Sequence, residues 1–272
     1  NNKWLLLVGI RKGAAGGIDG NMQLYSVAKK VSQPLTGHAG AFADIKINGE
    51  AQARTVFAFV DKKPGQPNHT LRCMQVDKPD GAAAGAADFP RFGKNVPFPP
   101  QAQQMHDFPC ALVASPKHDM LFLITKAGYM YMYFIHTGSL VYSRQLTKDT
   151  MFTTCKDTRS GGILAVTART GQVVSISVNE QTVVKYAQNL QGEPGLALKI
   201  ATVCGLSGAG DMFKQEFERL MSQQNYAGAA KLAAKTPGDD LRNADTIARF
   251  QALPTVQGQP SPLLQYFSAL LE

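Results

Sequence analysis

The sequence predicts a β-propeller followed by an α-solenoid in one chain of 272 residues. Up to Val178, short segments of alternating apolar and polar residues recur every ten or so residues, in groups that span roughly forty residues. Such a period of short antiparallel strands is typical of propeller blades. After Val178, apolar residues recur at helical spacing instead. A β-sandwich is the alternative for the first part, because blade motifs of the WD type are absent.

The stretch from Met22 to Gln33 has the features of a strand that receives a peptide. Met22, Leu24 and Ser26 alternate with residues that would point to the other face. Basic and hydrogen-bonding residues follow as far as Gln33, and Pro34 lacks the N–H donor that a longer ladder needs. We therefore expect a strand that ends in a basic rim suited to an extended peptide.

The only tryptophan, Trp4, begins another strand, at residues 4–10, which we expect to pair antiparallel with residues 22–28 across a glycine-rich surface loop. Low complexity predicts a flexible loop at residues 80–88, and prolines predict an extended segment at residues 89–100. Alternation and turn residues predict further strands at residues 42–47, 55–60, 70–76, 111–114, 120–125, 129–135, 140–145, 150–154, 163–168 and 172–178.

A second domain of short helices is expected at residues 179–272, after a strand domain at residues 1–178. Short helices with small-residue faces stack into solenoids, and the alanines between Asn225 and Ala233 would let neighbouring helices approach closely. Helical spacing of apolar residues predicts helices around residues 196–203, 212–221, 226–233, 247–253 and 263–271.

The net charge of +8 is unevenly distributed. Residues 1–178 carry 20 Lys and Arg against 11 Asp and Glu, whereas residues 179–272 carry 8 against 9. A basic domain can meet nucleic acid, anionic membrane or acidic peptides. No basic cluster is interleaved with aromatic residues and no nucleic-acid motif is present, so the sequence argues against nucleic acid.

The residues that usually carry chemistry are not arranged for it. No histidine has metal-ligand spacing to another or to a pair of carboxylates, and we expect His118 in a hairpin turn. Neither a nucleophile elbow nor a P-loop is present, and GLSGAG at residues 205–210 follows a helix, so we interpret it as an interhelix turn. We expect no enzyme activity, no metal and no cofactor. The five histidines are His38, His69, His106, His118 and His136.

Cysteine spacing and hydropathy indicate a cytosolic protein. The four cysteines lie far apart without a CxxC motif, and we expect them to be reduced core residues: Cys73, Cys110, Cys155 and Cys204. No run of eighteen apolar residues is present, so we expect no membrane span. The sequence begins without methionine and directly with strand-like residues, which we interpret as a fragment of a larger protein.

Six segments along nearly the whole chain resemble the clathrin heavy chain family. They are KWLLLVGI at residues 3–10, MQLYSVAKKVSQPL-GHA at 22–39, DFP at 107–109, KHDMLFLITKAGYMYMY at 117–133, NYAGAAKLAA at 225–234 and DTIARFQALP---GQPSPLLQYF at 245–267. The resemblance implies that residues 1–178 are the part of a seven-bladed propeller from within its fourth blade through its seventh. It also implies that residues 179–272 begin the family's helical zigzag linker.

The resemblance implies a structural coat protein without catalytic activity, on the cytosolic face of coated pits and coated vesicles. Its expected partners are adaptor and accessory proteins that present short acidic-hydrophobic peptides, together with other heavy chains and light chains in the full-length protein. Membrane association would be indirect, through adaptors, in endocytosis and intracellular vesicle transport. The alternative is a propeller–solenoid subunit of another membrane coat or tethering complex that has no adaptor-peptide groove.

The resemblance also implies a peptide groove between the fourth and fifth blades, of the kind that receives an arrestin-type loop. The family's clathrin-box groove, between the first two blades, lies outside this chain. Lys29 stands where the family usually has arginine, Met74 replaces a β-branched residue and Arg91 replaces a lysine. We expect the uncovered edge of the first strand to cause self-association. The residues that match the groove are Trp4, Leu24, Lys29, Val31, Ser32, Gln33, Met74 and Arg91.

Overall fold

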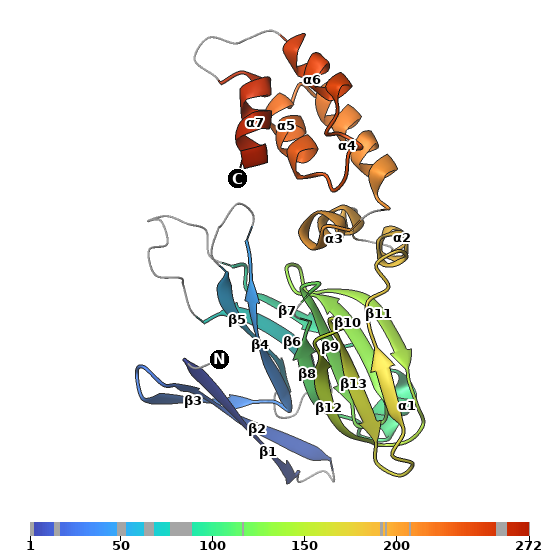
Figure 1. The fold of residues 1–272 in the computed structure, drawn as a ribbon. Coiled ribbons are helices and arrows are strands. Elements are labelled where there is room, and N and C mark those ends of the chain that lie inside the picture. The colour runs from blue at the N-terminus through green and yellow to red at the C-terminus, as the bar shows by residue number, and fades with distance from the viewer. Residues whose placement is uncertain are drawn as a thin grey trace. The chain divides into compact units, whose positions relative to one another are not determined.

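The computed structural model describes residues 3–13, 17–47, 53–62, 68–76, 89–115, 117–190, 193, 195–206, 208–253 and 260–271. The chain divides into two compact units, Asn1–Val178 and Asn179–Glu272. In the described residues the first unit consists of strands with one short helix, and the second unit consists of helices (Figure 1). The boundary follows Val178, where the sequence pattern changes from alternation to helical spacing.

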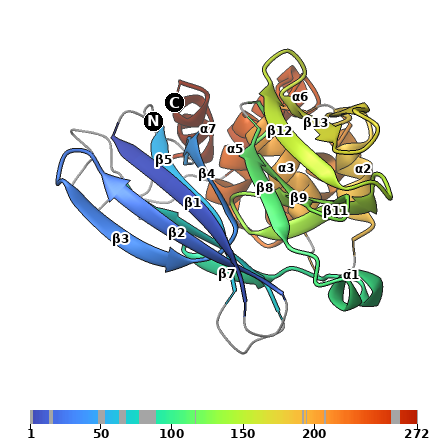
Figure 2. The ribbon, with the colours of Figure 1, turned by 90° about the horizontal axis from the view of Figure 1, so that it is seen from below.

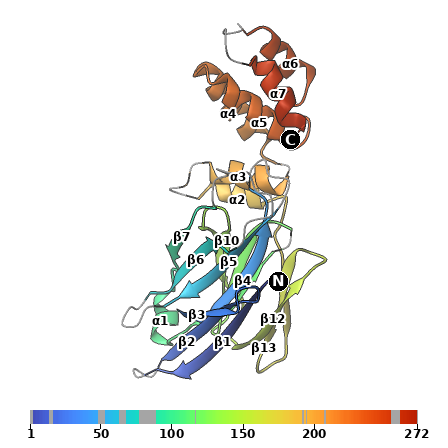
Figure 3. The same ribbon diagram turned by 90° about the vertical axis from the view of Figure 1, so that its left-hand side faces the viewer.

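The described strands of the first unit form four antiparallel sheets in which each strand pairs with the next along the chain (Figures 1 and 3). The first sheet is β1-β2-β3, the second β4-β5-β6-β7, the third β11-β10-β9-β8 and the fourth β12-β13-β14. Their bounds are β1 (Trp4–Lys12), β2 (Ile18–Ser26), β3 (Val31–Thr36), β4 (Ala39–Ile45), β5 (Arg54–Asp61), β6 (Thr70–Gln75), β7 (Phe92–Asn95), β8 (Pro109–Ala114), β9 (Met120–Thr125), β10 (Tyr129–Phe134), β11 (Ser139–Gln145), β12 (Met151–Asp157), β13 (Gly162–Thr167) and β14 (Val173–Ile176).

Strand β5 of the second sheet is buried on both faces, because it lies between two clusters of apolar side chains. Val56 and Val60 of β5 point into a cluster shared with the third sheet, whereas Phe57 and Phe59 point into a cluster shared with the first sheet. All four side chains are at most 4% exposed. The alternation of β5 therefore fixes which residues face which neighbour. The first strands of the second, third and fourth sheets also lie next to one another, since β4 contacts β8 and β8 contacts β12.

Two local features of the first sheet differ from the sequence prediction. The strand expected to end before Pro34 ends at Ser26 instead, and a turn leads into β3, which contains Pro34. Proline is tolerated there because, among the described strands, β3 is an edge strand that pairs with β2 alone. The loop expected at residues 11–21 is shorter, because β1 reaches Lys12 and β2 begins at Ile18. Residues 80–88 and most of the turn at 62–68 lie outside the described residues.

A short helix, α1 (Pro100–Gln104), lies in the segment expected to be extended. Its first residue is Pro100, and proline is favourable at the first helical position because its fixed φ fits the helix and its missing N–H would be unpaired there anyway. Five residues are too few to give a recognisable hydrophobic period, which is why the sequence did not indicate it.

The outer edge of β1 carries exposed apolar side chains. Leu5, Leu7, Val8 and Ile10 are 52%, 62%, 47% and 61% exposed, and β1 pairs with only one strand in the described part of the chain. A long apolar edge strand is a template for pairing with another chain. We therefore expect this chain to associate at high protein concentration, and we expect Leu7→Lys to abolish the association.

Sedimentation velocity over a concentration series tests this expectation. Val173→Lys is the matched control, because the Val173 side chain, at 60%, is about as exposed as that of Leu7 but lies on β14. A monomer at every concentration, or equal association of the Leu7→Lys variant, would show that the edge of β1 does not mediate it.

The second unit contains six helices in its described residues, and none has both the length and the apolar character needed to cross a bilayer. Helix α5 lies against α4 and α7, and it presents to them the closely packed face predicted from its alanines. Helix α2 was not predicted, because a six-residue helix shows little periodicity. The bounds are α2 (Val183–Gln188), α3 (Leu196–Cys204), α4 (Gly210–Ser222), α5 (Tyr226–Lys235), α6 (Ala244–Gln251) and α7 (Pro262–Leu271).

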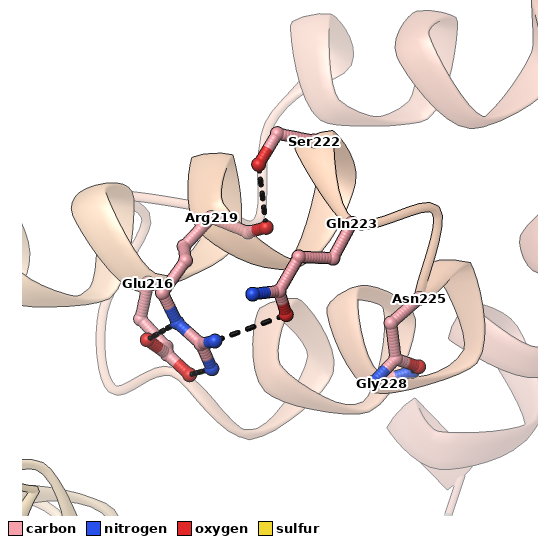
Figure 4. Close-up of polar contacts among 6 residues, drawn as sticks. All are labelled: Glu216, Arg219, Ser222, Gln223, Asn225 and Gly228. Carbon is pink, nitrogen blue, oxygen red and sulfur yellow. Dashed lines mark hydrogen bonds and ion pairs between the residues drawn. The ribbon is translucent and has the colours of Figure 1, made fainter.

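Polar side chains fix the connection from α4 to α5 (Figure 4). The Arg219 guanidinium donates to both carboxylate oxygens of Glu216, at 2.6 and 2.7 Å, and to Gln223 Oε1 at 3.0 Å. Asn225 Oδ1 accepts from the Gly228 N–H at 3.0 Å and so caps α5. The exposed ion pair contributes little to helix stability, whereas an asparagine cap contributes about 1 kcal/mol.

The glycine-rich segment at residues 205–210 is the turn between α3 and α4, as its sequence predicts. Its described residues line a hollow together with Phe213 and Asp240. The Asp240 carboxylate lies so close to Gly210 that a Cβ there would collide with it, and its Oδ1 is 2.8 Å from Lys214 Nζ. A carboxylate thus already occupies the start of α4, which disfavours a phosphate at this place.

Candidate peptide-binding seam

An apolar seam joins the first and second sheets. Its buried centre consists of Met22 and Leu24 from β2 with Phe57 and Phe59 from β5. Figure 2 shows the first sheet lying alongside the second. Six partly buried side chains surround this centre, and we call the whole set the seam: Trp4, Leu6, Leu35, Phe42, Met74 and Val76. The structure therefore brings together Trp4, Leu24 and Met74, which lie far apart in the sequence.

Trp4, Ser26 and Val31 form one cross-strand row on the seam face of the first sheet. Ser26 is 5% exposed and Val31 is 60% exposed, while Trp4 is half-buried. The small Ser26 side chain thus lies between the larger side chains of Trp4 and Val31, which both reach solvent. Such a row offers apolar contact area on either side of a low point, which suits an apolar side chain of a partner.

Gln33 lies in the next row, directly opposite the buried Leu24, and its own side chain is exposed. Ser32 pairs with Tyr25, so it faces the other side of the sheet. There its Oγ is 3.5 Å from Gln23 Oε1. Of the three predicted rim residues, Val31 and Gln33 therefore share the seam face with Trp4 and Leu24, and Ser32 does not.

Two exposed cations stand at one end of the seam. Lys29 lies in the turn before β3, where its backbone N–H donates to Ser26 Oγ at 3.4 Å. Arg91 immediately precedes Phe92, which pairs with Cys73. Continuing this register by one residue brings Arg91 opposite Met74, on the seam face of the second sheet. The side chains of Lys29 and Arg91 are exposed and can reach an acidic partner.

The other end of the seam is tied by hydrogen bonds between the sheets. The Asp61 carboxylate accepts from Thr36 Oγ1 of β3 at 2.6 Å and from Arg72 Nε of β6 at 3.0 Å. The Asp61 side chain is only 11% exposed, so its charge requires these donors. Because Thr36 belongs to the first sheet and Arg72 to the second, this carboxylate holds the edge of β3 in place.

Sequence reasoning did not single out Leu6, Phe42 or Val76, although all three contact the seam centre. Alternation would have found Leu6, which lies two residues after Trp4 and so shares its face. Phe42 and Val76 carry no such signal, because their role depends on which face of the second sheet meets the first. The close approach is visible at Gly40, where an added Cβ would lie 2.7 Å from Leu6 Cδ2.

The described residues contain no group of three histidine, cysteine or carboxylate side chains placed to hold a metal ion. The cysteines are free, but the expectation that they are all core residues is wrong, since Cys155 is exposed and only Cys73 is fully buried. Cys155 is exposed because its face of the fourth sheet has no covering layer within the described residues. Burial raises the pKa of Cys73 to about 12 and that of Cys110 to about 11.

The DFP segment has a structural role. Asp107 Oδ1 accepts from the N–H groups of Phe108 and Ala127, at 2.9 and 2.8 Å, and so fixes the turn before β10. His118 lies in the predicted turn between β8 and β9, although its side chain is only 1% exposed. His136 Nε2 is 2.8 Å from Asp119 Oδ2, which joins two neighbouring turns.

Comparison with known proteins gives a sequence relationship along the whole chain. Clathrin heavy chain 2 of Homo sapiens is 42% identical over 270 residues, which is 99% of this chain and 16% of that protein. The probable clathrin heavy chain 1 of Caenorhabditis elegans and the clathrin heavy chain of Drosophila melanogaster are each 40% identical over all of this chain, again 16% of their length. This chain thus spans about one sixth of the curated relatives it matches.

Comparison with solved structures gives weaker likenesses. Sqt1 from Chaetomium thermophilum matches with a TM-score of 0.39 and 13% identity, over 67% of this chain and 42% of that chain. The β-propeller domain of Myceliophteria thermophila Cps50 (Swd1) matches with a TM-score of 0.29 and 12% identity, over 63% of this chain and 73% of that domain. Likenesses at these scores do not establish a fold.

A family model supports the sequence relationship in the helical unit. The model described as Clathrin-H-link matches residues 205–270, which run from the end of α3 into α7. The curated relatives extend the relationship to the strands, since their alignments cover 99% to 100% of the chain. By sequence, this chain therefore belongs to the clathrin heavy chain family and corresponds to one segment of its members.

Proposed function

We propose that this chain is part of a structural, non-catalytic coat protein of clathrin-coated pits and vesicles, and that its seam binds extended peptides from adaptor proteins. Family membership supports the coat role. The half-exposed apolar side chains of the seam beside the open edge of β3 carry the peptide site. An extended peptide gains affinity from side-chain pockets and from backbone contacts at such an edge.

We further propose that the four sheets are the last part of a seven-bladed propeller, from within the fourth blade through the seventh, and that the helical unit begins the zigzag linker of the family. The meander order of each sheet and the adjoining first strands support this assignment. The seam would then be the groove between the fourth and fifth blades. The match of residues 205–270 to the linker family supports the second half.

The charge of the seam selects the chemistry of its partner. Lys29 and Arg91 are exposed at one end, whereas the Asp61 carboxylate at the other end is already paired with Arg72. The partner is therefore an extended segment with apolar residues beside acidic ones, of the arrestin type. Through such adaptors the protein reaches the cytosolic face of the membrane indirectly, and other heavy chains and light chains join it in the full-length coat.

Titration of this chain with an arrestin-type acidic-hydrophobic peptide, followed by Trp4 fluorescence, tests the proposal. We expect a saturable change in the high-micromolar range. Gln33→Ala should weaken peptide binding about fivefold, because the variant loses one side-chain hydrogen bond to the peptide, which contributes a net of about 1 kcal/mol. Trp4 is the only tryptophan, so the signal reports the seam alone.

Ser32→Ala is the matched control for Gln33→Ala. Ser32 is the neighbouring residue on the same strand but faces away from the seam. The dissociation constant of the Ser32→Ala variant for the peptide should therefore stay within about twofold of that of the unmodified chain. Equal losses in both variants would place the peptide outside the seam. No saturable change with a folded sample would remove the peptide site and favour a coat or tethering subunit without an adaptor groove.

A further inference from the structure

Two histidines that are 31 residues apart in the sequence form a buried pair in the first unit. His38 and His69 are 4% and 3% exposed, and their ring centroids are 5.5 Å apart. His38 also lies against Phe108, at 5.3 Å between centroids, and His69 against Phe98, at 4.8 Å. The two imidazoles are thus enclosed by aromatic rings and by each other.

The hydrogen bonds of the pair connect the first two sheets. His38 Nε2 lies 2.8 Å from the carbonyl oxygen of Ile18, the first residue of β2, and donates to it. The His38 backbone N–H donates to the carbonyl oxygen of Val60 in β5, at 3.3 Å. A Cβ added to Gly20 would lie 2.9 Å from His38 Cγ and would collide with the Gly37 carbonyl oxygen, so the ring is closely packed against β2.

The remaining ring nitrogens have no hydrogen-bond partner among the described residues. These are His38 Nδ1 and both nitrogens of His69. Neutral imidazole can tolerate this, but an imidazolium has two N–H donors and a charge, and it is costly to bury without acceptors. The enclosed geometry therefore holds both rings in the neutral state.

The charged groups that face the pair do not compensate a positive charge. Burial is the main cause that lowers the pKa of His38, and nearby Lys62 lowers it further, against opposing contributions from the Ile18 carbonyl and Asp19. Burial lowers the pKa of His69 to about 3, and His38 and Lys62 add to the effect. The nearby carboxylate of Asp61 is engaged by Arg72.

On the remaining side, Asp107 Oδ2 is buried without a hydrogen-bond partner among the described residues, so it is not bonded to either ring. Asp107 Oδ1 accepts from Phe108 and Ala127, and burial raises the pKa of this carboxyl group. His106 lies near Gly17, where an added Cβ would be 4.0 Å from its Nδ1, and its side chain is exposed. The exposed His106 therefore provides a control in the same region.

We propose that the His38–His69 pair makes the docking of the first sheet onto the second sheet sensitive to acid. His38 lies on the connection between β3 and β4 and binds the start of β2, whereas His69 directly precedes β6 of the second sheet. Protonation of either ring requires the rings to leave their enclosure, which separates the two sheets that build the seam. This inference does not rest on peptide binding.

The direction with pH follows from the depressed pKa values of the pair. Above the ordinary histidine pKa of about 6.5, the rings are neutral in both folded and unfolded chains, and the docked sheets keep their full stability. As pH falls below that value, the unfolded chain takes up protons that the folded chain excludes. A histidine that stays neutral in the folded chain, as His69 does with its pKa of about 3, then raises the unfolding constant about tenfold per pH unit.

Urea unfolding followed by Trp4 fluorescence at pH 7.5 and pH 5.5 tests the inference, without peptide. At pH 5.5, one unit below the ordinary pKa, His69 alone should raise the unfolding constant of the unmodified chain about tenfold, and His38 should add to this increase. His69→Phe, which fills the site without a titratable group, should show about tenfold less acid sensitivity. His106→Asn should respond to acid as the unmodified chain does.

A second variant and a second measurement cover the case in which His69→Phe is poorly folded. His69→Gln keeps a polar, uncharged side chain and should show the same reduced acid sensitivity. In the unmodified chain with isotope-labelled histidine, the imidazole signal of His69 should stay that of the neutral ring at pH 5.5 while the sheets are docked. Equal acid sensitivity of all variants, or imidazoles that titrate near pH 6.5 in the folded chain, would overturn the inference.

Discussion

Phe57→Ala is expected to destabilise the first unit by about 3–5 kcal/mol, the range for a fully buried phenylalanine. Phe57 is 0% exposed and lies at the centre of the seam. Its ring centroid is 5.1 Å from that of Phe42 and 5.1 Å from that of Phe59, on which it stacks. Alanine would remove these aromatic contacts and leave a cavity between two sheets that a rigid ladder cannot close.

Urea unfolding at pH 7.5, followed by Trp4 fluorescence, measures this loss, because Trp4 also belongs to the seam. Phe152→Ala is the matched control, since it makes the same substitution at a side chain that is 71% exposed. The control should change stability by less than about 0.5 kcal/mol. Similar losses for both variants would mean that Phe57 does not anchor the two sheets.

Ala230→Leu is expected to destabilise the helical unit by about 1–3 kcal/mol, because Ala230 is 0% exposed and the packed helices leave no room for a larger side chain. Helix α5 contacts both α4 and α7 through its alanine face, so a larger side chain must push one neighbour away. Leucine adds apolar volume at a site that has no free space, so the helices have to separate or bend.

Ala227→Leu is the control for Ala230→Leu, because Ala227 lies on the same helix but is exposed. Leucine there should change stability by less than about 0.5 kcal/mol. Thermal unfolding followed by circular dichroism at 222 nm reports the helices, whereas Trp4 reports only the strands. An unchanged helical transition in Ala230→Leu would contradict the close packing of α5.

Most strands were predictable because alternation and turn residues act locally. Residues 120–125 were predicted with the bounds that the structure shows, since apolar residues are bounded there by turns. β3 was not predicted, because its proline and polar residues resemble a strand end. Its pairing with β2 is set by the turn at residues 27–30, which alternation does not reveal.

The candidate seam was predictable in part. Trp4, Leu24 and Met74 followed from the family resemblance, and the structure gathers them in one cluster. Ser32 could not be separated from Gln33 by sequence, because the face of a residue changes with a shift of one position. The His38–His69 pair was not predictable either, since no periodicity links residues on different sheets.

The two edges of the first sheet differ in how long they can retain a bound chain. β1 offers an uninterrupted backbone, whereas β3 contains Pro34, which cannot donate to a ladder. A segment at β3 is therefore held mainly by side chains. At a dissociation constant of about 100 μM and an association rate of about 10⁶ M⁻¹s⁻¹, it would stay for only about 10 ms. If the proposed peptide site is correct, such brief residence would let many weak partners exchange at the edge of β3.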